Sequence, residues 1–203
     1  MKLHTADGLT LEGELRVPDD VRAAVVLAHP HPLYGGNMRS IVIGALFEGL
    51  PEAGVAALRF NFRGVGGSEG THDEGRGERL DVVAALDALV EVVGGRGLPL
   101  VLGGWSFGAD TSLAVDDERH AGWFAVAPPL RHTDDVAAAS DPRPKLLAVP
   151  ERDQFRSPES AREVVASWMN AEVQVVPGAD HFLVGRTDRA VELAVEFINR
   201  FLS

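Results

Sequence analysis

The chain has 203 residues, of which 45% are apolar and 24% charged, and this length and composition are typical of one globular domain. It contains no cysteine, which excludes disulfides, thiolate metal sites and a cysteine nucleophile, and favours a reducing cytoplasm. Thirty acidic side chains against nineteen basic ones give a formal charge of −11, which argues against a nucleic-acid-binding surface. We expect a single domain over residues 1–203, as a monomer or small homo-oligomer.

Apolar runs such as Ala23–Ala28 extend over only a few residues, far short of the roughly 20 that cross a bilayer. Residues 1–20 contain five acidic side chains and no continuous apolar segment, so they do not resemble a secretory signal. The sequence therefore predicts no membrane span.

The first twenty residues predict an antiparallel hairpin at the edge of a sheet. Leucine and valine alternate with polar residues from Leu9 to Val17, after the turn pair Asp7-Gly8. Short apolar runs without alternation follow, as in strands buried on both faces of a parallel sheet. These predicted strands are 23–28, 55–62, 98–102, 123–127, 146–149 and 173–176.

Segments with helical spacing of apolar residues lie between most of these runs. They are 38–46, 82–93, 109–115, 161–169 and 190–202. Ser157 is the predicted N-cap of the fourth, and Pro158 its predicted first helical residue. We interpret the glycine- and charge-rich stretch 64–79 as a loop. Strands and helices that alternate in this way predict a three-layer α/β/α sandwich around a mostly parallel sheet.

The sharpest motif is Gly104-Trp105-Ser106-Phe107-Gly108, between a predicted strand and a predicted helix. This is the G-x-S-x-G pattern that presents a nucleophilic serine on a tight turn. Larger side chains at the glycine positions would collide with the neighbouring strand and helix. The turn also sets the backbone N–H of Phe107 where a developing oxyanion could accept from it.

A serine hydroxyl needs a base to take its proton and an acid to orient that base. Asp153 and His181 each follow a later predicted strand, so the order Ser106, Asp153, His181 predicts a catalytic triad. Glu151 and Asp180 are alternative acids. We favour Asp153 by its position, because Asp180 adjoins His181 and would struggle to reach its Nδ1.

The second oxyanion donor should come from the loop 29–37, which follows the strand 23–28. Pro30 and Pro32 have no N–H. The remaining candidates are the backbones of His31, Leu33 and Tyr34, and the sequence does not choose among them.

Two alternative interpretations of the loops, a metal site and a phosphate-binding loop, are weakly supported by the sequence. No further cluster of His, Asp or Glu with metal-ligand spacing accompanies His29 and His31, so we expect no metal. The glycine-rich segment 64–70 lacks the lysine of a phosphate loop, and we expect no cofactor.

Together, HPHPLYGG at 29–36, RFNFRGVGGSEG at 59–70, GWSFG at 104–108, Asp153 and His181 make the chain resemble the α/β-hydrolase superfamily, specifically its compact bacterial branch related to dienelactone hydrolases. The resemblance implies an eight-stranded, mostly parallel sheet and a serine hydrolase acting on acyl compounds, with Arg63 and Ser68 supporting the nearby loop. Dienelactone hydrolases themselves use a cysteine nucleophile, whereas position 106 is serine. Only 128–144 separates two late strands, which leaves room for one short helix rather than a full cap domain.

These observations predict a serine hydrolase that cleaves carboxylic esters of small or exposed acyl groups through an acyl-enzyme. An amidase, thioesterase or acyltransferase could use the same triad. A non-catalytic binding module on the same fold is the alternative from another class.

Overall fold

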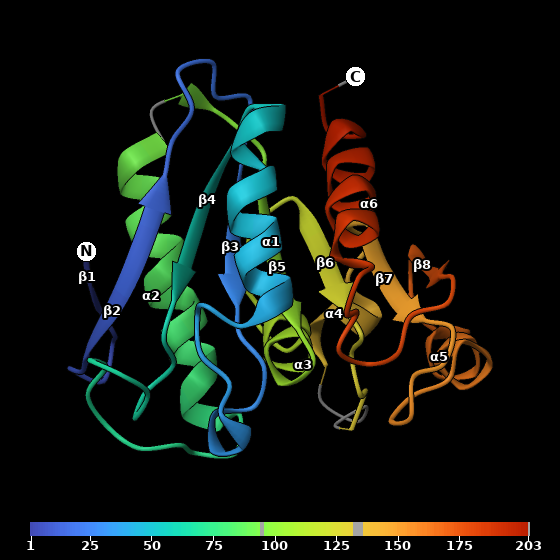
Figure 1. Ribbon diagram of the computed structural model, residues 1–203. Coiled ribbons are helices and arrows are strands. Elements are labelled where there is room, and N and C mark those ends of the chain that lie inside the picture. Colours follow the sequence, from blue (N-terminus) through green and yellow to red (C-terminus); the bar gives the residue numbers. More distant parts are fainter. Residues whose placement is uncertain (94–95, 132–135, 203) are drawn as a thin grey trace.

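The computed structural model describes residues 1–93, 96–131 and 136–202. Its centre is an eight-stranded sheet with the strand order β1-β2-β4-β3-β5-β6-β7-β8 (Figure 1). β2 runs antiparallel to both its neighbours, and all the other pairs are parallel. The strands are Lys2–His4 (β1), Thr10–Arg16 (β2), Ala23–Ala28 (β3), Val55–Phe60 (β4), Leu100–Trp105 (β5), Gly122–Val126 (β6), Lys145–Pro150 (β7) and Ala171–Val176 (β8). The predicted fold class and edge hairpin are confirmed.

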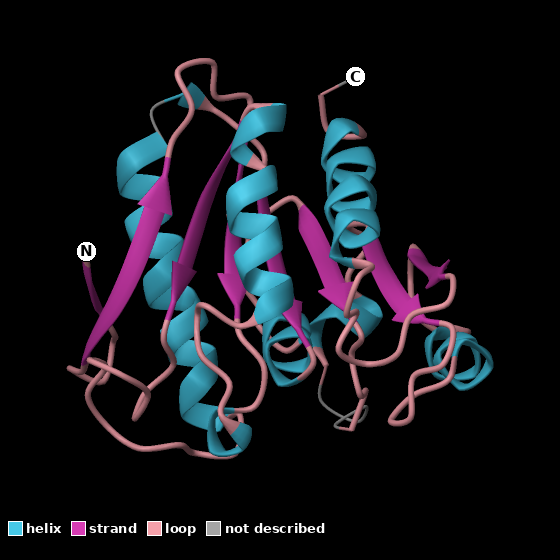
Figure 2. Ribbon diagram, viewed as in Figure 1, coloured by secondary structure: helices cyan, strands magenta, loops and turns pink. Residues whose placement is uncertain are grey.

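Helices cover both faces of the sheet, as Figure 2 shows, with α1 and α6 in front of it and α2 behind. The α-helices are Ile41–Gly49 (α1), Arg76–Val93 (α2), Phe107–Leu113 (α3), Ala137–Ser140 (α4), Pro158–Val165 (α5) and Thr187–Asn199 (α6), with short 3-10 turns at Pro32–Tyr34 and Pro51–Ala53.

The core is two apolar clusters, one on each face of the sheet. β3 is buried along its whole length and alternates between them. Val26 packs into the cluster that contains residues of α2, α3 and α5, whereas Val25 packs into the cluster that contains residues of α1 and α6. This double burial explains why the parallel strands are apolar without alternation.

Helix boundaries show where local hydrogen bonds outweigh apolar spacing. Ser157 caps α5 as predicted, because its side chain accepts from the backbone N–H of Ser160. The predicted loop 64–79 is too long, since α2 begins at Arg76. The Asp73 carboxylate accepts from Gly77 N and the Glu78 carboxylate accepts from Asp73 N, and these bonds stabilise an early helix start.

The strands β3 to β7 all end on one side of the molecule, the lower side in Figure 1, and the loops that follow them gather there. The described part of the segment after β6 contains the short helix α4 and no cap domain. Across the described ranges, every helix is too short or too polar to cross a membrane.

Candidate active site

Ser106 stands at a strained turn between β5 and α3. Its φ of 54° and ψ of −119° are unusual for a residue with a side chain. A Cβ on Gly104 would lie 2.4 Å from the backbone of Gly108, and one on Gly108 would lie 2.2 Å from the carbonyl oxygen of Ala28. Both glycines are therefore required by the close approach of backbone to backbone, as the motif predicts.

The structure brings Ser106, His181 and Asp153 together in one hydrogen-bonded row. The Ser106 Oγ lies 2.9 Å from His181 Nε2, and His181 Nδ1 lies 2.8 Å from Asp153 Oδ2. All three residues are buried, with at most 9% of their surface exposed. Burial strengthens these interactions because little water competes for the polar groups.

The carboxylate of Asp153 is held from its other oxygen. Asp153 Oδ1 accepts from the backbone N–H groups of Phe155 and Arg156, at 2.8 and 3.1 Å. The alternative acids bond elsewhere: Glu151 accepts from Gly178 N, and Asp180 accepts from Phe182 N. Among the described carboxylates, the partner of the His181 ring is therefore that of Asp153.

Two aromatic side chains fix the position of His181. Trp105, the second residue of the serine motif, donates from Nε1 to the carbonyl oxygen of His181 at 3.0 Å. Phe155 packs edge-on against the imidazole, with ring centroids 4.5 Å apart. The sequence predicts a role for neither residue; the GWSFG pattern contains Trp105, whereas nothing in the sequence singles out Phe155.

The loop after β3 is held by His29, whose ring is fully buried. Its Nε2 accepts from Phe62 N at 3.0 Å and its Nδ1 lies 2.6 Å from the carbonyl oxygen of Pro30, an arrangement that a neutral imidazole satisfies. Burial lowers the pKa of His29 to about 4. His29 is therefore a neutral support for the loop.

The backbone N–H groups of this loop narrow the choice of oxyanion donors. Leu33 N donates to the Nδ1 of His31 at 3.3 Å, and Tyr34 N donates to the carbonyl oxygen of His31 at 3.1 Å. Gly35 N and Gly36 N also have backbone acceptors within the loop. In residues 30–36, all of which the structure describes, His31 N is the N–H that has no such partner.

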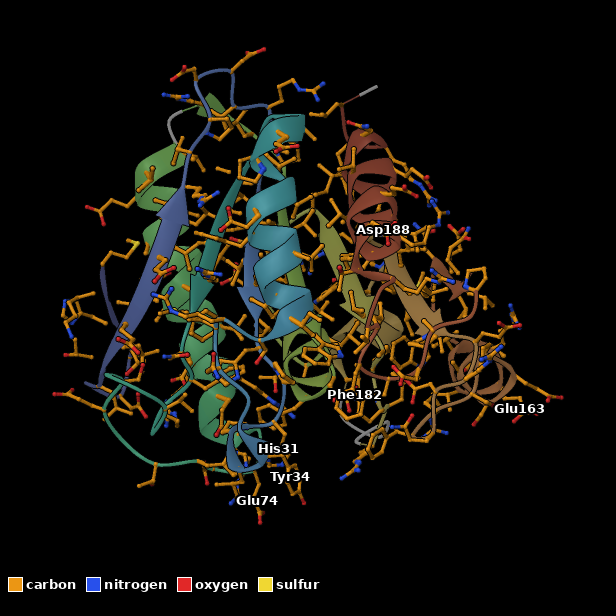
Figure 3. The ribbon with its side chains drawn as sticks, in the orientation of Figure 1. His31, Tyr34, Glu74, Glu163, Phe182 and Asp188 are labelled. Carbon is orange, nitrogen blue, oxygen red and sulfur yellow. The ribbon has the colours of Figure 1, made fainter. Side chains whose placement is uncertain are left out.

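Ser106 opens into a cavity of about 810 Å³. In Figure 3, His31, Tyr34 and Glu74 lie together at the end of the molecule where the strands end, and Phe182 lies on the same side. The rings of His31, His72 and Phe107 touch one another on the cavity wall, with centroids 4.9 to 5.4 Å apart. Apolar side chains also line the cavity, among them Leu113, Leu130 and Val136.

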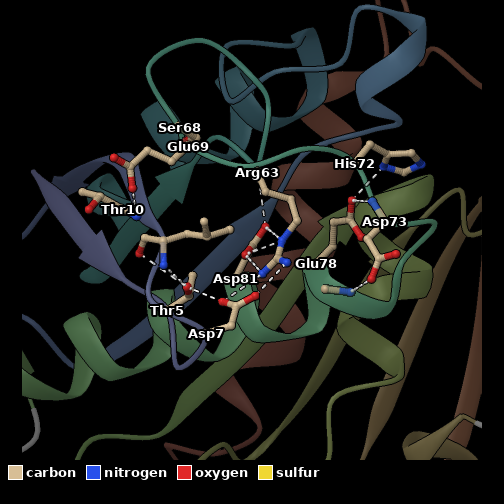
Figure 4. A network of polar contacts seen from close by, with 12 residues as sticks. Thr5, Asp7, Thr10, Arg63, Ser68, Glu69, His72, Asp73, Glu78 and Asp81 are labelled. Carbon is tan, nitrogen blue, oxygen red and sulfur yellow. Dashed lines mark hydrogen bonds and ion pairs between the residues drawn. The ribbon is translucent and has the colours of Figure 1, made fainter.

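A network of charged groups joins Arg63 to Asp81 and Asp7 (Figure 4). Arg63 donates to Asp81, which is fully buried, and to Asp7 nearer the surface. Although burial opposes it, these bonds raise the pKa of the guanidinium. Ser68 donates to Asn61 O and accepts from Glu12 N. Arg63 and Ser68 therefore support the loop, as the resemblance implies.

Glu78 organises the segment that carries His72. Its carboxylate, which is fully buried, accepts from Asp73 N and Gly75 N, and its Oε1 lies 2.7 Å from His72 Nδ1. Within the described ranges, no group of three or more His, Asp or Glu side chains could hold a metal ion.

The fold and this site define a hydrolase of the α/β class. The family model for the alpha/beta hydrolase domain matches residues 21–199, so the chain belongs to the α/β-hydrolase family.

Individual relatives agree with the family. The chain is 32% identical to an alpha-beta serine hydrolase homologue from Coxiella burnetii, with a TM-score of 0.87 over 97% of this chain and 95% of that one. It is 26% identical to an α/β serine hydrolase without a lid from Xanthomonas campestris, with a TM-score of 0.82 over 98% and 92% of the two chains. An uncharacterized protein of Rickettsia prowazekii is 33% identical over 190 residues, which cover 88% of this chain and 79% of that protein.

Proposed function

We propose that this chain is a carboxylesterase in which Ser106 is the nucleophile, His181 the general base and Asp153 the residue that orients His181. The observation that carries the proposal is the row of contacts from Ser106 Oγ through His181 to Asp153, at 2.9 and 2.8 Å. A binding module has no need of a serine held in a strained turn beside an oriented imidazole.

The reaction follows from these atoms. His181 Nε2 takes the proton of Ser106 as Oγ attacks the ester carbonyl carbon, and Asp153 stabilises the imidazolium that forms. His181 then gives its proton to the leaving alcohol as the carbon–oxygen bond of the ester breaks. A water molecule, deprotonated by the same imidazole, attacks the acyl carbon; His181 then returns the proton to Ser106 Oγ as the bond from Oγ to the acyl carbon breaks and the carboxylic acid leaves.

The oxyanion of each tetrahedral intermediate needs preorganised donors. We propose the backbone N–H groups of Phe107 and His31 for this role. Phe107 follows the nucleophile at the start of α3, and His31 N is left without an acceptor in its loop. The N–H of Leu33, a candidate from the sequence, is used by the His31 ring.

The substrate of this proposal is an ester whose acyl group is small or exposed, because no cap domain covers the site in the described part of the chain. The cavity of about 810 Å³ could also hold a larger acyl group. A solved structure with the same fold, Est1E from Butyrivibrio proteoclasticus, contains ferulic acid, with a TM-score of 0.83 and 16% identity over 100% of this chain and 99% of that one. An aromatic ester therefore belongs in a substrate panel beside short aliphatic ones.

The test is hydrolysis of p-nitrophenyl acetate and butyrate, and of methyl ferulate, by the purified protein and its Ser106→Ala variant. We expect wild-type turnover of at least one ester and a loss of about four orders of magnitude or more in kcat for the variant. Equal rates for the two proteins would contradict the proposal. Amide and thioester analogues in the same panel separate the ester preference from the other reactions of this triad.

A further inference from the structure

We propose that the imidazole of His31 is a positioning residue for the oxyanion hole, through the hydrogen bond that its Nδ1 accepts from Leu33 N. This inference rests on the proposed function, and concerns a side chain that the triad mechanism leaves unused.

The geometry of the loop places a side-chain acceptor at this position. His31 lies between Pro30 and Pro32, and the proline that follows it disfavours helical backbone angles. Its φ of −52° and ψ of 121° turn the chain into the 3-10 turn Pro32–Tyr34, where Leu33 N has no backbone acceptor. The imidazole supplies that acceptor at 3.3 Å.

The neighbouring carbonyl groups are bonded as well, since Pro30 O, which shares a peptide unit with His31 N, lies 2.6 Å from His29 Nδ1. The carbonyl oxygen of His31 already accepts from Tyr34 N and Gly36 N, at 3.1 Å each. Gly36 lies so close that a Cβ there would be 2.0 Å from Pro30 O. With the carbonyl oxygen and the side chain of His31 both bonded to its own loop, its N–H is left as the group that can donate to a ligand.

The ring is also packed against the other half of the proposed oxyanion hole. Its centroid lies 5.0 Å from that of Phe107, whose backbone N–H is the first donor, and 4.9 Å from that of His72. His72 Nδ1 in turn lies 2.7 Å from the buried carboxylate of Glu78. The His31 ring therefore contacts the side chain of the residue that carries the first donor.

The bond requires a neutral ring, because an imidazolium has no lone pair on Nδ1. Burial, the neighbouring His72 and the charge of Arg131 lower the pKa of His31, against the opposite effect of Glu78. The surroundings of the ring thus favour the acceptor form.

The experiment compares His31→Ala with His31→Asn. Asparagine lacks the ring but can accept from the backbone N–H two residues later. We expect His31→Ala to lower kcat by about 10- to 100-fold, less than the loss of a whole oxyanion donor, with KM changed by less than about twofold. His31→Asn should recover most of kcat. The rate of phosphonylation by a fluorophosphonate, which also places a charged oxygen in the hole, should follow the same order.

His4→Ala and His4→Asn are the matched controls, because His4 is an exposed histidine of β1 at the far edge of the sheet. An unchanged kcat in His31→Ala would overturn the inference, and so would an equal loss in His31→Ala and His31→Asn, which would assign the effect to ring packing. A wild-type protein that neither turns over esters nor reacts with the probe would remove the proposed function, and this inference with it.

Discussion

Asp153 and His181 face each other across the ends of two adjacent strands, with Asp153 Oδ2 2.8 Å from His181 Nδ1. The loops after β7 and β8 bring these residues, 28 positions apart in the chain, into contact. Since the Nδ1 side faces a carboxylate, Nε2 is left to face Ser106 with its lone pair. In the proposed mechanism, this relationship sets the direction in which the proton moves.

Asp153→Asn tests that relationship. An amide keeps the shape of the carboxylate but neither stabilises the imidazolium nor reliably holds the required tautomer, so we expect kcat to fall by about 10³- to 10⁴-fold with little change in melting temperature. Ester hydrolysis and thermal unfolding measure the two effects. Asp180→Asn is the control, because that carboxylate bonds to Phe182 N rather than to the ring. A larger loss of kcat in Asp180→Asn than in Asp153→Asn would show that Asp153 is not the residue that orients His181.

Gly108→Ala tests the close approach at the serine turn. The new Cβ would lie 2.2 Å from Ala28 O, so the backbone must shift, and we expect a destabilisation of about 3 kcal/mol or more. Gly44→Ala, in α1, is the matched change. Its Cβ would lie 3.7 Å from Arg39 O, an ordinary contact, and alanine favours a helix. Denaturant unfolding should find Gly44→Ala neutral or stabilised. Equal stability of the two variants would show that the turn is not tight.

The buried pair of Arg63 and Asp81 gives a prediction about stability. Asp81→Asn leaves the guanidinium of Arg63 buried and short of one carboxylate, and we expect a loss of about 3 kcal/mol. Asp7→Asn removes the other carboxylate of the same guanidinium. Because the Asp7 side chain is 38% exposed, its loss should cost less than about 1 kcal/mol. Urea unfolding of both variants measures the two losses of stability. A larger loss in Asp7→Asn than in Asp81→Asn would contradict this prediction.

Acid should destabilise the protein through buried histidines. Burial, followed by the charge of Arg143, lowers the pKa of His120 to about 4, and burial does the same for His29. A histidine in the unfolded chain titrates near about 6.5, so between these values the unfolded state binds more protons. The free energy of unfolding is therefore highest above about pH 6.5 and falls as the pH drops toward 4, by up to about 3 kcal/mol for each ring.

His120→Phe isolates one of these contributions. The ring of His120 packs edge-on against Trp123 at 4.3 Å, and both of its nitrogens are buried. Phenylalanine can occupy the same space without a titrating group. Unfolding measured from pH 4 to 7 should show a shallower pH dependence than in the wild type. The same slope in both proteins would mean that His120 is not the group that takes up a proton.

Most of the fold could be predicted from the sequence because burial on two faces leaves a clear pattern. Strand β3 was predicted at its observed limits, since apolar residues fill it and proline and polar residues follow. Boundaries that depend on side-chain hydrogen bonds were less accurate. α1 begins at Ile41 instead of Met38, because Met38 N donates to Asn61, a residue of a different loop.

The candidate site was predictable where chemistry constrains adjacent residues. The glycines around Ser106 mark a turn by their spacing alone. The second oxyanion donor could not be chosen among His31, Leu33 and Tyr34 from the sequence, because the choice depends on which N–H groups are already bonded in the folded loop. His72 and Phe155 are brought to the cavity by tertiary packing, which leaves no periodic or motif signal.

The central claim is that Ser106 is a nucleophile activated by His181. Its most direct test is mass spectrometry of the folded protein after reaction with a fluorophosphonate probe, followed by peptide mapping. We predict one adduct per chain, located on Ser106, and its loss in His181→Ala at equal folded content. An unmodified Ser106 in wild-type protein, or equal labelling in His181→Ala, would contradict the account.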